Sequence, residues 1–232
     1  MGSSVVLGLA AVFVLAACTP GMTAAVASLR EMVPGRAAVA TANLDPKFAY
    51  LRVTRGKHVG FLWRGSIERT AEGPVEVYYS STGEVLRLRD GRLVGASGLA
   101  TEWRQVEDRA PAWRALVTAR EPTAFVRVRD VMPGYRSGVR DELLLHPIEA
   151  PRRSALQVID PRTLTWFEER TRSRGFELRG TPADTLPAAR YALDLSGSEP
   201  AVVYSEQCVA KDLCFTWQRW SLAMQKASTQ RR

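Results

Sequence analysis

Short segments that alternate apolar and polar residues, separated by turn residues, dominate the chain from about Lys47 onward. The cleanest alternation runs from Val85 to Arg89 and ends at Asp90-Gly91, a dipeptide that strongly favours a two-residue hairpin turn. The same reasoning predicts further strands over residues 48–53, 58–67, 75–79, 92–94, 123–131, 139–146, 156–159, 164–170, 191–195, 201–208 and 214–222.

Helical signals are few. Pro111 introduces a short helix over 112–119, and a second helix is predicted over 23–32, where Pro34-Gly35 ends it. Strands and helices do not alternate regularly, which argues against a doubly wound parallel sheet. We therefore predict a mainly β domain over 46–225, built as a single antiparallel sheet that is strongly curved or a half-barrel, with a few short helices. A polar tail is predicted over 226–232.

The N-terminus carries an apolar run from Val5 to Val14, followed by Leu15-Ala16-Ala17-Cys18. The run is shorter than the roughly 20 residues of a membrane-spanning helix and suits the apolar region of a secretory signal peptide. The four residues that follow match a lipobox, the motif at which bacteria attach lipid to a cysteine. This predicts a signal peptide over 1–17, covalent lipid on Cys18 and a spacer over 18–45. The alternative is a chance apolar stretch in an alanine-rich chain.

The lipobox places the chain in the cell envelope, tethered to a membrane by its acyl chains. Thr19 follows the cysteine, and the absence of Asp at that position favours the outer membrane, with the domain facing the periplasm. Lipid on Cys18 leaves Cys208 and Cys214, which are expected to form a disulfide in an oxidising compartment. Their spacing is not that of a C-x-x-C redox pair, and neither histidine lies nearby to complete a zinc site.

The formal net charge is +8, and most of the positive charge is arginine. A basic face can meet anionic polysaccharide or lipid headgroups, whereas export argues against nucleic acid as a partner. A GC-rich genome would also enrich arginine. Alternation along the strands places neighbouring arginines on one face of the sheet, either towards solvent or along a groove. The candidate anion or glycan contacts are Arg87, Arg89, Arg92, Arg127 and Arg129.

Signatures of catalysis are missing from the sequence. It has no G-x-S-x-G motif, no phosphate-binding loop and no dinucleotide fingerprint. The two histidines are far apart and suggest no metal site. Glu168 and Glu169 are neighbours on a predicted strand, so their side chains should point to opposite faces. Trp217 and Trp220 should likewise face opposite sides. We therefore expect no enzyme activity, no metal and no cofactor beyond the lipid on Cys18.

Several segments together resemble a known family. They are the lipobox, the stretch from Tyr78 to Val85 that runs into 88–94, the Gly98-Leu99 pair and the tryptophan-bearing C-terminal strand. Over about residues 45–222 the chain resembles the YjbF/GfcB-type lipoproteins of exopolysaccharide and group 4 capsule operons. The resemblance implies a fold similar to lipoprotein-carrier (LolA-like) sheets. It also implies an outer-membrane lipoprotein that assists polysaccharide production or export, beside a periplasmic companion and an outer-membrane barrel.

Three hypotheses follow for the function. The first is a non-enzymatic accessory lipoprotein that binds glycan or a protein partner through a basic, aromatic surface. The second is a module that handles lipids or lipoproteins and encloses acyl chains in a concave sheet. The third, with least support, is a carbohydrate-active enzyme, which would need two converging carboxylates. What lines the inner face of the sheet distinguishes the three.

Overall fold

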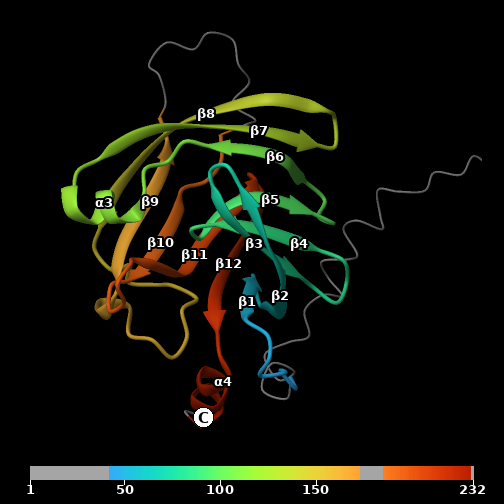
Figure 1. Cartoon of the computed structure of the whole chain (residues 1–232), viewed down its shortest axis with the longest axis vertical. Coiled ribbons are helices and arrows are strands. Elements are labelled where there is room, and N and C mark those ends of the chain that lie inside the picture. Colours follow the sequence, from blue (N-terminus) through green and yellow to red (C-terminus); the bar gives the residue numbers. More distant parts are fainter. Residues whose placement is uncertain (1–41, 173–184, 231–232) are drawn as a thin grey trace, which may run out of the picture.

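The strands form one closed antiparallel barrel in a computed structural model that describes residues 42–172 and 185–230 (Figure 1). Each strand pairs with its neighbours in the sequence, and β1 closes the barrel against β12. The strands are β1 (Tyr50–Arg55), β2 (His58–Thr70), β3 (Gly73–Tyr79), β4 (Val85–Arg89), β5 (Arg92–Ser97), β6 (Glu102–Asp108), β7 (Thr123–Met132), β8 (Arg136–Ile148), β9 (Thr165–Thr171), β10 (Ala189–Asp194), β11 (Ala201–Ala210) and β12 (Leu213–Trp220). The helical elements are α3 (Trp113–Ala119), the short 3₁₀ turn η1 (Pro161–Thr163) and α4 (Leu222–Gln230).

The predicted open sheet or half-barrel is wrong, because the two ends of the sheet meet. Tyr50 of β1 lies opposite Trp220 of β12, and the pairing continues to Thr54 opposite Thr216. Closure removes the exposed edges that an open sheet would leave. Strand alternation reports which residues share a face, and it carries no information on whether the first and last strands pair.

Two local predictions also fail. Strand β6 was not predicted; its register with β5 comprises the single pair Ala96 and Trp103, and its pairing with β7 contains an irregularity. Conversely, the strand predicted over 156–159 lies in the β8–β9 connection. Leu156 is apolar there because it packs on the outside of the barrel and not because it belongs to the sheet.

The remaining predictions along the chain have mixed outcomes. The helix predicted over 112–119 is α3. Residues 226–230 of the predicted polar tail are part of α4. The signal peptide, the helix predicted over 23–32 and Cys18 lie outside the described residues. Among the described helices, none has the length and apolar character needed to cross a membrane.

The predicted hairpin at Asp90-Gly91 is present and reaches the opposite wall of the barrel. Both residues have positive φ, 49° and 78°, as a tight two-residue turn requires. The Gln207 side chain of β11 accepts from the Leu93 amide at 3.0 Å and donates to the Gly91 carbonyl at 3.1 Å. A Cβ on Gly91 would lie 2.4 Å from that of Val202. The barrel is therefore flattened here, with the β4–β5 turn directly against β11.

Side chains fill the inside of the barrel. Helix α3 inserts Trp113, whose ring centroid lies 5.6 Å from that of Phe167 and 5.2 Å from that of Tyr191. Trp217 is fully buried in the same core cluster. Trp220 instead packs near Phe61, which does not belong to that cluster, so the prediction that the two tryptophans face opposite sides is confirmed.

A second, smaller core lies on the outside of the barrel wall. There the connection between β8 and β9, residues 149–164, covers Trp166, Ala192 and Tyr204 through Leu156 and its neighbours. The Ala155 amide donates to the Tyr204 hydroxyl at 2.9 Å. This connection is therefore a packed part of the domain, and its position matters for the site described below.

An ionic cluster links β2, β3 and β12. The Glu76 carboxylate accepts from Arg64 at 2.7 Å and from Arg219 at 2.6 Å, and Tyr78 donates to it at 3.2 Å. Burial opposes ionisation of Glu76, but the hydrogen bonds and charges of the two arginines outweigh burial and hold its pKa below the ordinary 4.5. Because β1 lies between β2 and β12, this cluster reinforces the closure of the barrel.

Replacing Glu76 by Gln should lower the free energy of unfolding at pH 7 by about 1.5–3 kcal/mol, the range for hydrogen bonds to charged groups. The folded-state pKa is depressed, so this stabilisation is present above about pH 4.5 and is lost as pH falls through the folded value. Urea unfolding of wild type and variant between pH 3 and 7 should show the difference narrowing towards acid. The exposed Glu121→Gln is the control, and a difference independent of pH would contradict the assignment.

Candidate functional site

A buried ionic network occupies the inside of the barrel between β7, β8, β9 and β10. The Asp141 carboxylate accepts from Arg127 Nε at 3.0 Å and from Arg129 Nε and Nη2 at 2.8 and 3.1 Å. Glu169 accepts from Arg127 Nη1 at 3.0 Å and from the Tyr191 hydroxyl at 3.1 Å. Every member is buried, so the charged groups are stabilised by one another and not by water.

The electrostatics of this network follow from burial and pairing. Burial opposes the charge on Arg127, but the charges of Glu169 and Asp141 outweigh it and raise its pKa. Burial raises the pKa of Glu169, and Arg127 only partly offsets that effect. Trp103 completes the cluster, because the guanidinium carbons of Arg127 and Arg129 lie 4.9 and 5.1 Å from its ring centroid.

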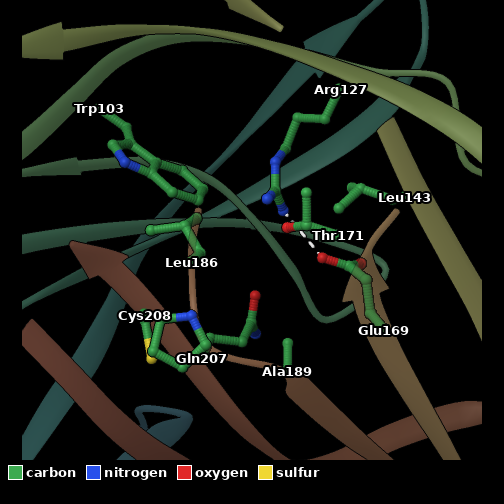
Figure 2. Close-up of a pocket in the computed structure, with 10 residues that line it drawn as sticks. Trp103, Arg127, Leu143, Glu169, Thr171, Leu186, Ala189, Gln207 and Cys208 are labelled. Atoms are coloured by element: carbon green, nitrogen blue, oxygen red, sulfur yellow. Dashed lines mark hydrogen bonds and ion pairs between the residues drawn. The ribbon is translucent and has the colours of Figure 1, made fainter. Parts of the chain in front are cut away.

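A small pocket lies beside this network, with Arg127 and Glu169 pointing towards each other across it (Figure 2). Trp103, Leu186 and Gln207 also line it. Its cavity volume is about 10 Å³, which is the space of a single water molecule. It is therefore too small for an acyl chain or a sugar.

The five predicted arginine contacts do not form one surface. Arg127 and Arg129 belong to the buried network. Arg92 is also buried; its guanidinium carbon lies 3.8 Å from the Trp113 ring centroid, and it donates to the Pro111 carbonyl at 3.1 Å. Arg87 pairs with Glu68, whereas Arg89 lies 3.7 Å from a carboxylate oxygen of Glu72 and donates to the Asp108 carbonyl at 3.2 Å. All five already have partners within the chain.

The predicted cysteine pair is joined. Cys208 of β11 and Cys214 of β12 lie opposite each other in the strand register and form a disulfide with an S–S distance of 2.03 Å. The bond therefore crosslinks two adjacent strands beside the turn that joins them.

Two of the segments that carry the family resemblance, the stretch from Tyr78 to Val85 and the Gly98-Leu99 pair, meet at one turn. Glu84 is buried and accepts from the hydroxyls of Ser80 and Thr82. Gly98 has a φ of +75°, and a Cβ there would lie 2.6 Å from the Gly83 carbonyl oxygen. These residues fix the β3–β4 turn against the end of β5, which is a structural role.

The vicinal acids point to opposite faces, as predicted. Glu169 is part of the inner network, whereas Glu168 accepts from Arg170 and from Arg190, the latter at 3.1 Å. Burial opposes ionisation of Glu168, but these two arginines outweigh it and lower its pKa. The pair therefore cannot act as the two facing carboxylates of a glycosidase.

A groove on the outer surface has a different character. It lies between the turn that joins β1 to β2 and the 149–164 connection, and its volume is about 310 Å³. Volumes of about 300–1,000 Å³ are typical of ligand sites. Basic residues stand on both sides: Arg52 and Lys57 come from the β1–β2 hairpin and Arg153 from the connection. The remaining lining residues are Thr54, Gly56, Val59, Ser154, Ala155 and Gln157.

Both walls of this groove are held in place. The Gln157 amide donates to the Gln218 side chain at 2.9 Å, and Gln218 donates back to the Gln157 carbonyl at 2.8 Å. Arg52, only 8% exposed, donates to the Thr54 hydroxyl at 3.0 Å, and its guanidinium carbon lies 5.6 Å from the Trp220 ring centroid. We call this feature the outer basic groove.

Sequence reasoning did not find the outer basic groove. Its cations come from segments that are distant in the sequence. Arg153 lies just before residues 156–159, which were predicted to form a strand and not the wall of a groove. The only local signal was the basic doublet Arg152-Arg153. The pairing of Arg52 with Gln218 across β1 and β12, which brings the 149–164 connection beside β1, depends on barrel closure.

The fold has a counterpart among solved structures. The crystal structure of the hypothetical lipoprotein YmcC from Escherichia coli (K12) is similar to this chain, with a TM-score of 0.52, 16% sequence identity, and coverage of 80% of this chain and 94% of that one. At this identity the likeness establishes a shared fold. No protein-family model and no curated protein matches the sequence.

Proposed function

We propose that this chain is an envelope lipoprotein, anchored through Cys18, that acts as a non-enzymatic accessory factor in the production or export of a surface polysaccharide. Its placement at the outer membrane, facing the periplasm, and its work beside a barrel and a periplasmic companion belong to the same proposal. In this account the outer surface of the domain is the working surface.

The observation that carries the proposal is the lipobox ahead of a domain with this fold. The signal Leu15-Ala16-Ala17-Cys18 precedes the barrel, and the similar solved structure is that of a protein described as a hypothetical lipoprotein. The family resemblance in 78–99 supports the polysaccharide role.

The pocket beside the inner network does not suit the lipid-handling hypothesis. An acyl-chain carrier needs an apolar cavity, whereas this pocket has room for one water molecule and is lined by the buried pair Arg127 and Glu169. We therefore expect ligand binding on the outer surface of the described domain.

The anchor is tested by metabolic labelling with a palmitate analogue, followed by membrane fractionation. Wild type should carry the label and sediment with membranes. Cys18→Ala should lose the label completely, because no other thiol stands at a lipobox. The double variant Cys208→Ala/Cys214→Ala is the matched control and should keep the label. Label retained on Cys18→Ala would refute the anchor.

A further inference from the structure

We propose that the outer basic groove binds the carboxylate groups of an acidic glycan chain. The inference rests on the proposed function and deepens it, because it assigns a ligand class and a location to an otherwise unspecified surface. It is carried by the charge and shape of the groove and by the state of Lys57 and Arg153, which make no ion pair with a described residue.

The first argument is the state of its cations. Lys57 and Arg153 are exposed, and neither makes an ion pair with a described residue. Some exposed arginines elsewhere on the surface have acidic partners, as Arg114 has Glu199 and Arg162 has Asp160 at 2.9 Å. The groove therefore keeps positive charge available for a ligand.

The second argument is the lining. No Asp or Glu lines the groove within the described part of the chain. Positive charge on both walls would bring an anionic group between Lys57 on one side and Arg153 on the other. A guanidinium also favours carboxylates, because it can donate two parallel hydrogen bonds to them. Like charges facing each other across a gap repel, and an oxyanion between them relieves that repulsion.

The third argument is pre-organisation. Arg52 is already fixed by Thr54 and Trp220, and the 149–164 wall is anchored through Gln157 and Gln218. A ligand would therefore order few side chains on binding, which lowers the entropic cost. The Ser154 hydroxyl has no hydrogen bond with a described residue and can meet a sugar hydroxyl.

The fourth argument is location. Tyr50, where the chain enters β1, pairs with Trp220, which precedes α4, so both described chain ends lie at one end of the barrel (Figure 1). The β1–β2 turn is at the other end of β1, and a strand advances by about 3.3 Å per residue. The groove extends along β1 from Arg52, two residues after Tyr50, to this turn. A comparison of an acidic polymer with anionic vesicles therefore distinguishes a polymer ligand from the headgroups of a membrane.

The full lipidated protein, held in neutral detergent micelles, is titrated with polygalacturonate, and the binding affinity is measured. Neutral dextran, inorganic phosphate and vesicles containing phosphatidylglycerol are the comparison ligands. The groove variant is Lys57→Glu/Arg153→Glu. The control is Arg69→Glu/Lys211→Glu, which makes the same change in net charge at exposed positions that do not line the groove.

We expect wild type to bind polygalacturonate and not dextran, the groove variant to lose at least about tenfold in affinity, and the control to lose less than about threefold. The affinity should fall as salt rises. Equal losses in the two variants would overturn the proposal, since they would show a net-charge effect. Tighter binding to the vesicles, or binding to phosphate alone, would also overturn it. None of these failures touches Cys18-dependent polymer output, so the proposed function is judged separately.

Discussion

Replacing Asp141 by Ala should lower the free energy of unfolding by about 3–5 kcal/mol, the cost of removing one partner from a buried ion pair. Asp141 accepts three hydrogen bonds from Arg127 and Arg129, and both arginines are buried. Without it, Arg127 keeps its bond to Glu169, whereas Arg129 loses its bidentate partner. The stability of a whole domain is typically about 5–15 kcal/mol, so this single change should remove a large part of it.

Urea unfolding followed by tryptophan fluorescence measures this loss. Glu199→Ala is the control, because it also removes an arginine's carboxylate partner, but at the surface, and it should cost no more than about 1 kcal/mol. The double variant Asp141→Ala/Arg129→Met should recover part of the stability, since it also removes the buried guanidinium that lost its bidentate carboxylate. Similar losses for Asp141→Ala and Glu199→Ala would show that the inner network is not buried as described.

The second large effect is expected at the turn that flattens the barrel. Gly91→Ala should destabilise the domain by about 3 kcal/mol, from two sources. The left-handed backbone at φ +78° costs a residue with a side chain about 1–2 kcal/mol. The new methyl group would also lie 2.4 Å from Val202 Cβ, and overpacking of this kind costs about 1–3 kcal/mol.

Gly56→Ala separates the two sources. Gly56 also has a positive φ, +57°, but a Cβ there meets nothing within 4 Å. Its substitution should therefore carry the backbone cost alone. Thermal unfolding of both variants gives the difference, and equal shifts in midpoint would mean that the β4–β5 turn does not contact β11. Val202→Gly should partly rescue Gly91→Ala, because it removes the Val202 Cβ that the added methyl group would meet.

Local rules predicted local features well. The Asp90-Gly91 turn and α3 depend on residues that are neighbours in the sequence. The opposite orientations of Glu168 and Glu169 follow from the two-residue period of a strand, without knowledge of the tertiary structure. The disulfide follows from an even pair of cysteines within one hairpin.

Features that depend on distant contacts were not predictable in this way. Alternation correctly placed Arg127 with Arg129 on one face, yet it could not show that this face is the inside of a barrel. Their acidic partners come from other strands, so the arginines looked unpaired in the sequence. Closure of the barrel joins β1 to β12, which lie at opposite ends of the described chain. The outer basic groove likewise combines the β1–β2 hairpin with the distant segment around Arg153.

The central claim is that a membrane-tethered form of this protein is needed for surface polysaccharide. The most direct test is exopolysaccharide output in a clean deletion strain, complemented in turn with wild type and with Cys18→Ala at matched protein levels. The account predicts that output is lost in the deletion, restored by wild type and not restored by Cys18→Ala. Unchanged output in the deletion would contradict the role in polysaccharide production, and full rescue by Cys18→Ala would contradict the need for the anchor.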